Sequence, residues 1–357
     1  MQRRETISFK VRDVGIGSAY PVTIQSMTNT PTILEEETLQ QVRALAHAGA
    51  ELVRVAVPDH HALKGLAYIV KESPVPIIAD IHFDYRLAIG AMEAGVDGLR
   101  INPGNLGGVE RMQEVVRLAK ARKVPMRIGV NSGSVHKKYL AQYGGPTSDA
   151  MVASLKEYVQ IAEGEGYESI VLSIKASNVP TMIEANRLVA KEDLPYPLHL
   201  GVTEAGSPKS GTIKSAVGIG ALLSEGIGDT IRVSLTGDPV AELSVARDIL
   251  RALGLRKEGV EVIACPTCGR TRIDLAPLTA AVEDLVKDIK LPLRIAVMGC
   301  AVNGPGEARE AHLGIAGGKG EGLIFKHGET LRKVPENELL LSLKEEIDNI
   351  LKENENL

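Results

Sequence analysis

An alternation of apolar runs and amphipathic segments between residues 22 and 254 constrains the fold of this chain more than any other feature. Eight short runs rich in β-branched residues are each followed by a stretch with helical periodicity, such as residues 35–49. The runs occupy residues 22–28, 52–57, 77–83, 98–103, 126–132, 169–177, 198–206 and 230–236. Such alternation is typical of parallel strands covered by helices. The eight repeats, with no GxGxxG fingerprint after the first run, favour a (β/α)8 TIM barrel over residues 1–255 rather than a doubly wound open sheet.

The composition excludes several other classes of protein. Of the 357 residues, 44% are apolar, which is too many for a disordered chain. The net charge of −4, the low aromatic content of 3% and the absence of Trp argue against a nucleic-acid-binding surface. No apolar run approaches the roughly 18 residues of a membrane helix, and the first residues lack the apolar stretch of a signal peptide. We therefore expect a soluble cytoplasmic protein that binds neither nucleic acid nor membrane.

Polar side chains occur at or near the ends of the eight runs, where a barrel of this type places its active site. Five of them are cations: Arg54, Arg100, Arg127, Lys175 and Arg232. An arginine at a strand end often only pairs with a neighbouring carboxylate. Five together without anionic partners would cost several kcal/mol each to bury, and guanidinium groups match phosphate oxygens well. The pattern predicts a small substrate with two or more phosphates.

The three cysteines, Cys265, Cys268 and Cys300, all lie in a second region of different character. Over residues 260–357 the pattern predicts a strand entering Cys-x-x-Cys, a helix over 274–289, a strand over 293–300, a Gly-rich segment with one further strand, and a terminal helix. This is a small α+β domain. An odd number of cysteines in a chain of this kind indicates metal or redox chemistry rather than a disulfide framework.

Zinc and an iron–sulfur cluster are the two candidate occupants of this cysteine site. Zinc usually completes its tetrahedron with further Cys or His ligands, and His312 is the imidazole nearby in sequence. In a cubic cluster, Cys-x-x-Cys supplies two adjacent corners, and three cysteines leave one iron without a thiolate. Glu307, seven residues after Cys300, is the candidate for that position. Its alternative role is that of a solvated carboxylate at a helix start.

Two cysteine motifs, CPTCGR (265–270) and MGCAVNGPGEA (298–308), resemble the 4-hydroxy-3-methylbut-2-en-1-yl diphosphate synthases of the non-mevalonate isoprenoid pathway. Five further segments share the resemblance, at 22–30, 79–88, 100–105, 127–134 and 201–206. It implies a barrel followed by a cluster domain similar to that of sulfite and nitrite reductases. It also implies a [4Fe-4S] cluster held by Cys265, Cys268, Cys300 and Glu307, with ferredoxin or flavodoxin as electron donor. The chain lacks room for the large insert of plant-type relatives and so resembles the compact bacterial form.

The implied reaction is the reductive ring opening and dehydroxylation of 2-C-methyl-D-erythritol 2,4-cyclodiphosphate to 4-hydroxy-3-methylbut-2-enyl diphosphate. On this hypothesis the five cations clamp the diphosphate. Further substrate contacts are expected from His82, Asn102, Asn131 and Ser234. Glu204, near the end of the seventh run, is the candidate catalytic proton donor to the departing hydroxyl, and its alternative role is pairing with an arginine of the mouth. Asp80 and His82 are expected to position the substrate or each other.

The connection between the two regions predicts a dimer. A helix over 239–253 carries the chain about 22 Å away from the barrel mouth, and the connector 255–259 spans at most about 18 Å. The second domain then attaches at the end opposite its own mouth. A head-to-tail homodimer with composite active sites follows from this geometry, and the family resemblance implies the same.

Two alternatives remain open at this point. One is a sugar-phosphate lyase or aldolase barrel with structural zinc in its tail, which would contain no inorganic sulfide. The other is an iron–sulfur sensor or scaffold, which has no need of a convergent cationic pocket.

Overall fold

The structure, a computed structural model, describes residues 2–192, 194–300 and 308–355. The chain divides into two units, Met1–Arg256 and Lys257–Leu357, each with a hydrophobic core of its own. No helix in these described ranges is both long enough and apolar enough to cross a membrane.

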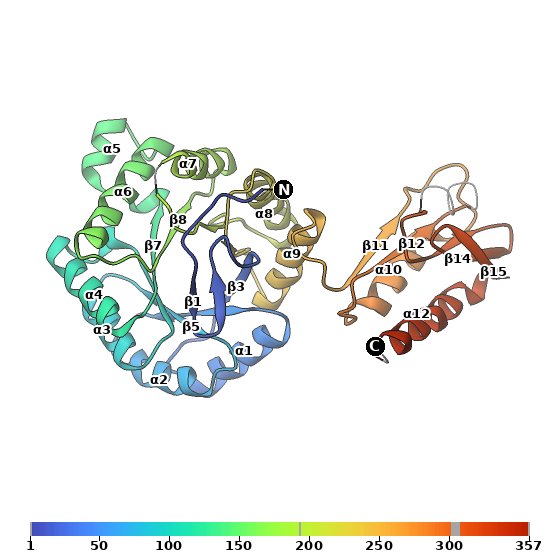
Figure 1. Cartoon of the computed structure of the whole chain (residues 1–357), viewed down its shortest axis with the longest axis horizontal. Helices are drawn as coiled ribbons and strands as arrows, with labels where there is room; N and C mark the ends of the chain where they lie inside the picture. The colour runs from blue at the N-terminus through green and yellow to red at the C-terminus, as the bar shows by residue number, and fades with distance from the viewer. Residues whose placement is uncertain (1, 193, 301–307, 356–357) are drawn as a thin grey trace. The chain divides into compact units, whose positions relative to one another are not determined.

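The first unit is an eight-stranded parallel barrel, which confirms the predicted fold class (Figure 1). Its strands are β3 (Thr23–Met27), β4 (Leu52–Val57), β5 (Ile77–Ile81), β6 (Gly98–Ile101), β7 (Met126–Asn131), β8 (Ile170–Lys175), β9 (His199–Leu200) and β10 (Thr230–Ile231). The ladder runs β8-β7-β6-β5-β4-β3-β10-β9. It closes between β8 and β9 through a single bridge from Leu172 to Leu198, so this seam is the weakest part of the ladder.

Helices surround the barrel between successive strands (Figure 1). They are α1 (Glu35–His47), α2 (Ala62–Glu72), α3 (Tyr85–Glu93), α4 (Val109–Arg122), α6 (Ser148–Gly164), α7 (Val179–Lys191), α8 (Pro208–Ser224) and α9 (Pro239–Ala252), with a short additional α5 (Lys137–Tyr143) before α6. Several begin at a side-chain cap: Asp84, Thr147, Asn178 and Asp238 each accept a hydrogen bond from a backbone N–H in the first turn. Local capping therefore fixes where these helices start, next to the barrel mouth.

The alternation of side chains along the strands decides what fills the barrel. On β4, Val53, Val55 and Val57 belong to the core shared with the helices, whereas Leu52 belongs to a separate apolar cluster at the barrel floor. Arg54 therefore shares the inward face with Leu52. A TIM barrel interior is usually packed with branched apolar residues; here the apolar layer is confined to the floor, and charged side chains fill the level above it.

The floor is completed by an N-terminal hairpin that the sequence pattern did not predict. Its strands are β1 (Phe9–Val11) and β2 (Val14–Ile16). Val11 and Ile16 pack against Leu52, Ile78 and Val171 from inside the barrel. The hairpin therefore covers the lower end of the barrel, opposite the carboxyl ends of its strands.

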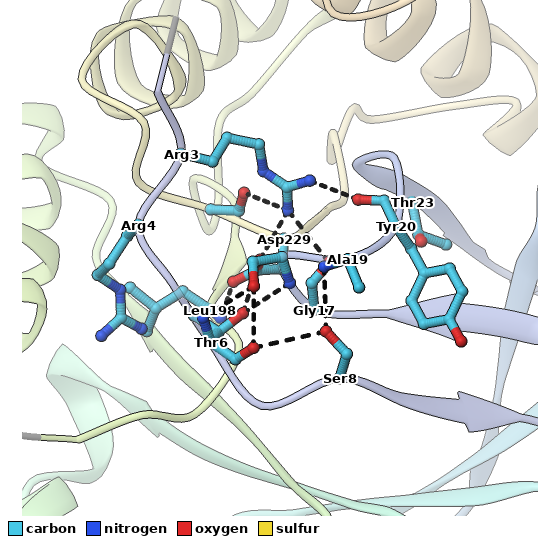
Figure 2. A network of polar contacts seen from close by, with 12 residues as sticks. Arg3, Arg4, Thr6, Ser8, Gly17, Ala19, Tyr20, Thr23, Leu198 and Asp229 are labelled. Atoms are coloured by element: carbon cyan, nitrogen blue, oxygen red, sulfur yellow. Dashed lines mark hydrogen bonds and ion pairs between the residues drawn. The ribbon is translucent and has the colours of Figure 1, made fainter.

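The residues before the hairpin join the floor to the seam of the barrel (Figure 2). Arg3 Nη2 lies 2.7 Å from Asp229 Oδ1, and Arg4 donates to the carbonyl of Tyr196 at 2.6 Å. The second carboxylate oxygen of Asp229 accepts from the backbone N–H of Leu198 at 2.9 Å. Asp229 and Leu198 directly precede β10 and β9, so this network ties the N-terminal segment to the two shortest strands.

In the part of the second unit that the structure describes, a five-stranded sheet is accompanied by two helices. The elements are β11 (Val260–Ala264), α10 (Leu275–Val286), β12 (Leu293–Met298), β13 (Leu313–Gly317), β14 (Glu321–Lys326), β15 (Glu329–Pro335), a short 3₁₀ turn (Glu336–Glu338) and α12 (Leu339–Glu355). Strands β11, β12 and β13 are parallel, and β14 and β15 continue the sheet as an antiparallel hairpin. The α+β class of this unit is as predicted. The parallel pair β11–β12 places the ends of these strands side by side.

Candidate active site

A cavity of about 60 Å³ lies inside the barrel at the carboxyl ends of the strands. It is lined by seven of the residues predicted from the sequence to bind substrate: Arg54, Arg100, Arg127, Asn131, Lys175, Arg232 and Ser234. Ser173 and Thr203 also line it and were not predicted. All five predicted cations therefore line one cavity.

Asp80 on β5 holds two of these arginines. Its Oδ1 lies 3.1 Å from Arg100 Nη1, and its Oδ2 lies 3.5 Å from Arg54 Nε. The Nε2 atom of His82 lies 3.3 Å from the same Oδ2. Burial alone would raise the pKa of Asp80, but Arg54 and its other cationic neighbours hold this pKa below its ordinary value. Asp80 is thus an ionised anchor that orients both guanidinium groups.

Arg54 has an unusual second partner in the thioether of Met27. Its Nε and Nη2 atoms lie 3.0 and 2.9 Å from Met27 Sδ. Burial lowers the pKa of Arg54 to about 10, an effect that Asp80 partly opposes. A thioether is a weak acceptor, so Arg54 keeps donor capacity for a stronger acceptor that enters the cavity.

Glu242 on α9 is a buried carboxylate that sequence analysis missed. Its Oε2 lies 3.4 Å from Arg232 Nη2, and its Oε1 accepts from the backbone N–H of Leu235 at 2.9 Å. Burial raises the pKa of Glu242, and Arg232 opposes that rise. Glu242 occupies the buried face of α9 together with Pro239, Leu243 and Ala246. A carboxylate within an otherwise apolar stripe is the pattern that identifies it.

The remaining two cations have no carboxylate at ion-pair distance among the described residues. Arg127 Nη1 donates to Gln25 Oε1 at 2.5 Å, but its Nη2 is buried without a protein partner. Lys175 Nζ lies 3.1 Å from Nε2 of His199. Two carboxylates thus serve five buried basic side chains in this part of the chain, and the four guanidinium groups alone leave the cavity with a surplus of positive charge.

Three predicted residues lie outside the lining of the cavity. His82 is half-buried beside Asp80, with its Nε2 3.2 Å from Arg100 Nη1. Asn102 is buried, and its Oδ1 has no partner in the described structure. Glu204 is exposed, and its backbone has φ of +52°, a left-handed conformation that is costly for a residue with a side chain and is concentrated at functional sites.

The cysteines are positioned by the ends of two adjacent strands. Cys265 follows β11 and Cys300 lies two residues beyond β12, and the ladder pairs Ala264 with Val297. The backbone N–H of Gly299 donates to Cys265 Sγ at 3.1 Å. Cys268 is exposed, and the backbone N–H of Arg270 lowers the pKa of its thiol.

These thiols suit a metal centre that binds thiolates, because backbone N–H groups stabilise negative charge on sulfur. All three are free thiols. Within the described ranges no three His, Cys, Asp or Glu side chains converge closely enough to hold a metal ion. The predicted fourth ligand, Glu307, lies outside the described residues.

Comparison with known proteins identifies relatives of both units of the chain. A family model for the GcpE TIM-barrel domain matches residues 6–247, and one for the GcpE protein C-terminal domain matches residues 261–349. A protein of Clostridium perfringens is 54% identical over 350 residues, covering 98% of this chain and 100% of the relative. A protein of Geobacter sulfurreducens is 53% identical over 351 residues, covering 98% and 99%. Both carry the name 4-hydroxy-3-methylbut-2-en-1-yl diphosphate synthase (flavodoxin).

Solved structures support the fold of the barrel. The dihydropteroate synthase of Stenotrophomonas maltophilia matches with a TM-score of 0.51 and 14% identity, covering 69% of this chain and 98% of that one. The Yersinia pestis enzyme of the same name matches with a TM-score of 0.50 and 13% identity, covering 70% and 100%. At this identity the likeness concerns the fold alone. The family matches and the full-length relatives go further: this chain belongs to the GcpE family of 4-hydroxy-3-methylbut-2-en-1-yl diphosphate synthases, as its motifs predicted.

Proposed function

We propose that this oxidoreductase converts 2-C-methyl-D-erythritol 2,4-cyclodiphosphate into 4-hydroxy-3-methylbut-2-enyl diphosphate with electrons from reduced flavodoxin. Two electrons and two protons enter, a carbon–oxygen bond of the ring breaks, and one hydroxyl leaves as water. The surplus of buried cations in the barrel cavity carries the proposal, because a dianionic ring is the kind of molecule that balances it.

The cavity residues bind and orient the diphosphate in this proposal. Arg54 and Arg100 form ion pairs with Asp80, and Arg232 forms one with Glu242. The guanidinium groups therefore need little rearrangement when the substrate enters. Arg127 and Lys175 complete the clamp, and Asn131 and Ser234 add neutral hydrogen-bonding groups on the same lining. Preorganised donors of this kind lower a barrier chiefly by fixing the reacting geometry.

Residues from two regions of the chain are assigned to the electron-transfer site. We assign Cys265, Cys268, Cys300 and Glu307 as ligands of a [4Fe-4S] cluster. The free thiols after β11 and β12, and the N–H groups directed at Cys265 and Cys268, support the assignment. Such a cluster supplies single electrons at low potential.

Glu204 is proposed to protonate the departing hydroxyl. Two observations support this role: the left-handed backbone at Glu204, and the lack of an ion pair from its carboxylate to any described residue. A carboxylate at the mouth without an internal partner is free to meet the substrate. Glu204→Gln keeps the hydrogen-bonding shape but cannot donate a proton of comparable acidity. We expect its kcat to fall at least 100-fold with KM little changed, and normal turnover would remove Glu204 from the role.

The active enzyme is proposed to be a homodimer in which the cluster domain of one chain serves the barrel of its partner. The short connector after α9 motivates this prediction. Mixing a Cys300→Ala chain with a Glu204→Gln chain tests it, because a heterodimer would contain one intact composite site. We expect about a quarter to half of wild-type activity to return. No recovery would indicate sites built within one chain.

Anaerobic assay of the purified protein tests the function as a whole. The reaction mixture contains the cyclodiphosphate and chemically reduced flavodoxin, and the product is identified by mass spectrometry. Iron and sulfide analysis of the same sample tests the cluster assignment. Full iron and sulfide content with no conversion of the cyclodiphosphate would contradict the substrate assignment, and zinc without sulfide would contradict the cluster.

A further inference from the structure

A buried histidine, not predicted from the sequence, contacts one of the substrate-binding cations. His199 on β9 is fully buried, with its Nε2 3.1 Å from Lys175 Nζ and its Nδ1 3.2 Å from Thr230 Oγ1. The backbone closes tightly around the amine: a Cβ atom on Gly201 would lie only 2.9 Å from Lys175 Nζ. The three side chains come from β8, β9 and β10 and form a chain of polar contacts across the seam of the barrel.

The hydrogen-bonding needs of Thr230, His199 and Lys175 determine which of these side chains donates to which. Thr230 is buried, and in the described structure its hydroxyl has no partner besides His199. A buried hydroxyl that donates to nothing costs about 1–3 kcal/mol. Thr230 therefore donates to Nδ1, and the single proton of a neutral imidazole is then on Nε2. Because Nε2–H is directed at Lys175, the lysine nitrogen must accept, and only an uncharged amine has the lone pair to do so.

The charges around Lys175 favour the same state. Four guanidinium groups face it: Arg54 on β4, Arg100 on β6, Arg127 on β7 and Arg232 after β10. Two carboxylates, Asp80 on β5 and Glu242 on α9, contact three of these arginines, so four positive charges less two negative ones leave two. Burial first, and Arg127 next, lower the pKa values of both Lys175 and His199. A neutral imidazole beside a neutral amine is thus consistent with the field inside the cavity.

We propose that Lys175 is an uncharged amine in the ligand-free enzyme and takes up one proton from water when a dianion enters the cavity, with His199 as the positioning residue. The dianion cancels the two surplus charges that suppress protonation of the amine. Lys175 then carries three protons and donates to Nε2, while the imidazole stays neutral with its own proton moved to Nδ1, facing Thr230. The amine gains one N–H bond, and the Nε2–H bond of His199 breaks as an Nδ1–H bond forms. The net change is one proton taken up by the protein.

Two consequences distinguish this proposal from a permanently charged lysine. The fifth cation of the cavity exists only while its counter-ion is present, so the empty barrel does not bury it. In addition, Lys175 has a higher pKa in the complex than in the free enzyme. Between those two values, affinity for the dianion falls about tenfold for each unit by which the pH rises.

Titration calorimetry of the complete, non-reduced enzyme measures the proton directly. Each phosphate of the cyclodiphosphate carries one carbon ester and the shared anhydride bond, which leaves it a single, strongly acidic ionised oxygen. The ligand itself therefore exchanges no proton near neutral pH. Binding heats in three buffers of different ionisation enthalpy are expected to show uptake of about one proton. The matched variant Lys175→Arg keeps a cation that cannot lose its proton and should show none. Wild-type binding without proton uptake overturns the proposal.

A second ligand separates this inference from the proposed function on which the identity of the dianion rests. Sulfate is a dianion throughout this pH range and is titrated in the same buffers. If the cyclodiphosphate does not bind but sulfate binds with proton uptake, the substrate assignment fails and the proposal about Lys175 survives. If both bind without uptake, the proposal about Lys175 fails and the substrate assignment stands.

Nitrogen NMR of the ¹⁵N-histidine-labelled enzyme tests the role of His199 without any turnover. We expect the proton of His199 on Nε2 in the free protein and on Nδ1 in the complex, with the resonance assigned by its loss in His199→Gln. An unchanged tautomer on binding overturns the positioning role. Variants give an independent readout: His199→Gln retains a donor and an acceptor, and we expect its Kd to rise by about threefold, against at least tenfold in His199→Leu. A residue that only fills space predicts the reverse order.

Discussion

Arginines at the two ends of the barrel, half-buried at the floor and buried at the mouth, have different partners. At the floor, Arg3 meets Asp229 at 2.7 Å, and Arg4 donates to two carbonyls, those of Leu194 at 2.8 Å and Tyr196 at 2.6 Å (Figure 2). At the mouth, Arg127 has an unpartnered Nη2 and Lys175 has only a histidine. At the floor the Nη atoms of Arg3 and Arg4 all reach acceptors of the chain, one of them a carboxylate, although their Nε atoms are buried without a partner. At the mouth, neither Arg127 nor Lys175 has a carboxylate partner among the described residues.

This difference shows which buried charges serve the fold and which serve a ligand. The floor network joins residues more than 220 positions apart, since Arg3 and Asp229 are separated by 226 residues. It therefore stabilises the closed barrel whether or not a ligand is present. The mouth cluster costs stability when the cavity is empty, because its positive charge is only partly compensated. Removal of a mouth cation that lacks a carboxylate should therefore raise stability and weaken binding, whereas removal of a floor contact should lower stability and leave binding unchanged.

The largest change in the free energy of unfolding is expected at Asp80, the carboxylate that pairs with two arginines of the mouth. Asp80→Asn leaves both Arg54 and Arg100 without a counter-ion at the site, and removing one partner of a buried ion pair costs about 3 kcal/mol or more. Urea unfolding at neutral pH measures the loss. The control is Asp84→Asn, which alters an exposed pair with Arg86 and keeps a good helix cap, so a change below about 0.5 kcal/mol is expected. Equal losses in both variants would contradict the central role of Asp80.

At Arg127 we expect a substitution to raise the free energy of unfolding instead of lowering it. Arg127→Met removes a buried cation that lacks a carboxylate and replaces it with an apolar side chain of similar length. We expect the free energy of unfolding to rise by about 1–2 kcal/mol, while the Kd for the cyclodiphosphate rises about 30-fold through the loss of charge-assisted hydrogen bonds.

Unfolding and calorimetric titration of one protein sample measure both quantities. Arg117→Met, at an exposed pair with Glu165, is the control and should leave Kd unchanged. A less stable Arg127→Met protein would mean that the mouth is compensated as fully as the floor.

The sequence predicts the barrel and its cations because both are local patterns. Strand and helix periodicities repeat eight times, and a cation near a strand end is visible without knowledge of its neighbours. His199 and Glu242 are different. Each is one polar residue within an apolar segment, and its meaning depends on Lys175 or Arg232, which other elements supply. Such pairings are set by tertiary packing.

Elements with weak local patterns were also missed. The floor hairpin has strands of three residues each, too short to show alternation. Strands β9 and β10 are only two residues long, although the apolar runs 198–206 and 230–236 suggested more. In the second unit, β14 and β15 turn at His327 and Gly328, which both have positive φ. Asn-Gly or Asp-Gly would have indicated such a turn, whereas His-Gly does not.

A smaller effect is expected at the floor. Asp229→Asn removes the charge opposite Arg3, whose side chain is 17% exposed, but leaves an amide oxygen that still accepts from Thr6 or Leu198. We expect a loss of about 1–2 kcal/mol in the free energy of unfolding. Because Asp229 does not line the cavity, kcat and KM should stay within twofold of wild type below the unfolding temperature. A selective loss of kcat in a fully folded variant would break the division between the two ends.

The smallest expected effect is on the pH dependence of stability, and it compares Asp80 at the mouth directly with Asp229 at the floor. Burial is the largest influence on both, but Arg54 and the other cations hold the pKa of Asp80 below its ordinary value, whereas burial raises the pKa of Asp229. The contribution of Asp80 is therefore present above about pH 3.9, the ordinary value for an unfolded chain, and is lost as the pH falls below it. Asp229 has the opposite pH dependence. Its contribution to the free energy of unfolding is fully present below about pH 3.9 and is lost as the pH rises through the pKa of Asp229 in the folded protein.

Unfolding of wild type, Asp80→Asn and Asp229→Asn across the acid range separates these contributions. The stability difference between wild type and Asp80→Asn should grow with rising pH below about 4, and the difference for Asp229→Asn should shrink with rising pH above about 4. Parallel slopes would show that the two carboxylates experience the same environment. In that case the contrast between a compensated floor and an uncompensated mouth would have to rest on the arginines alone.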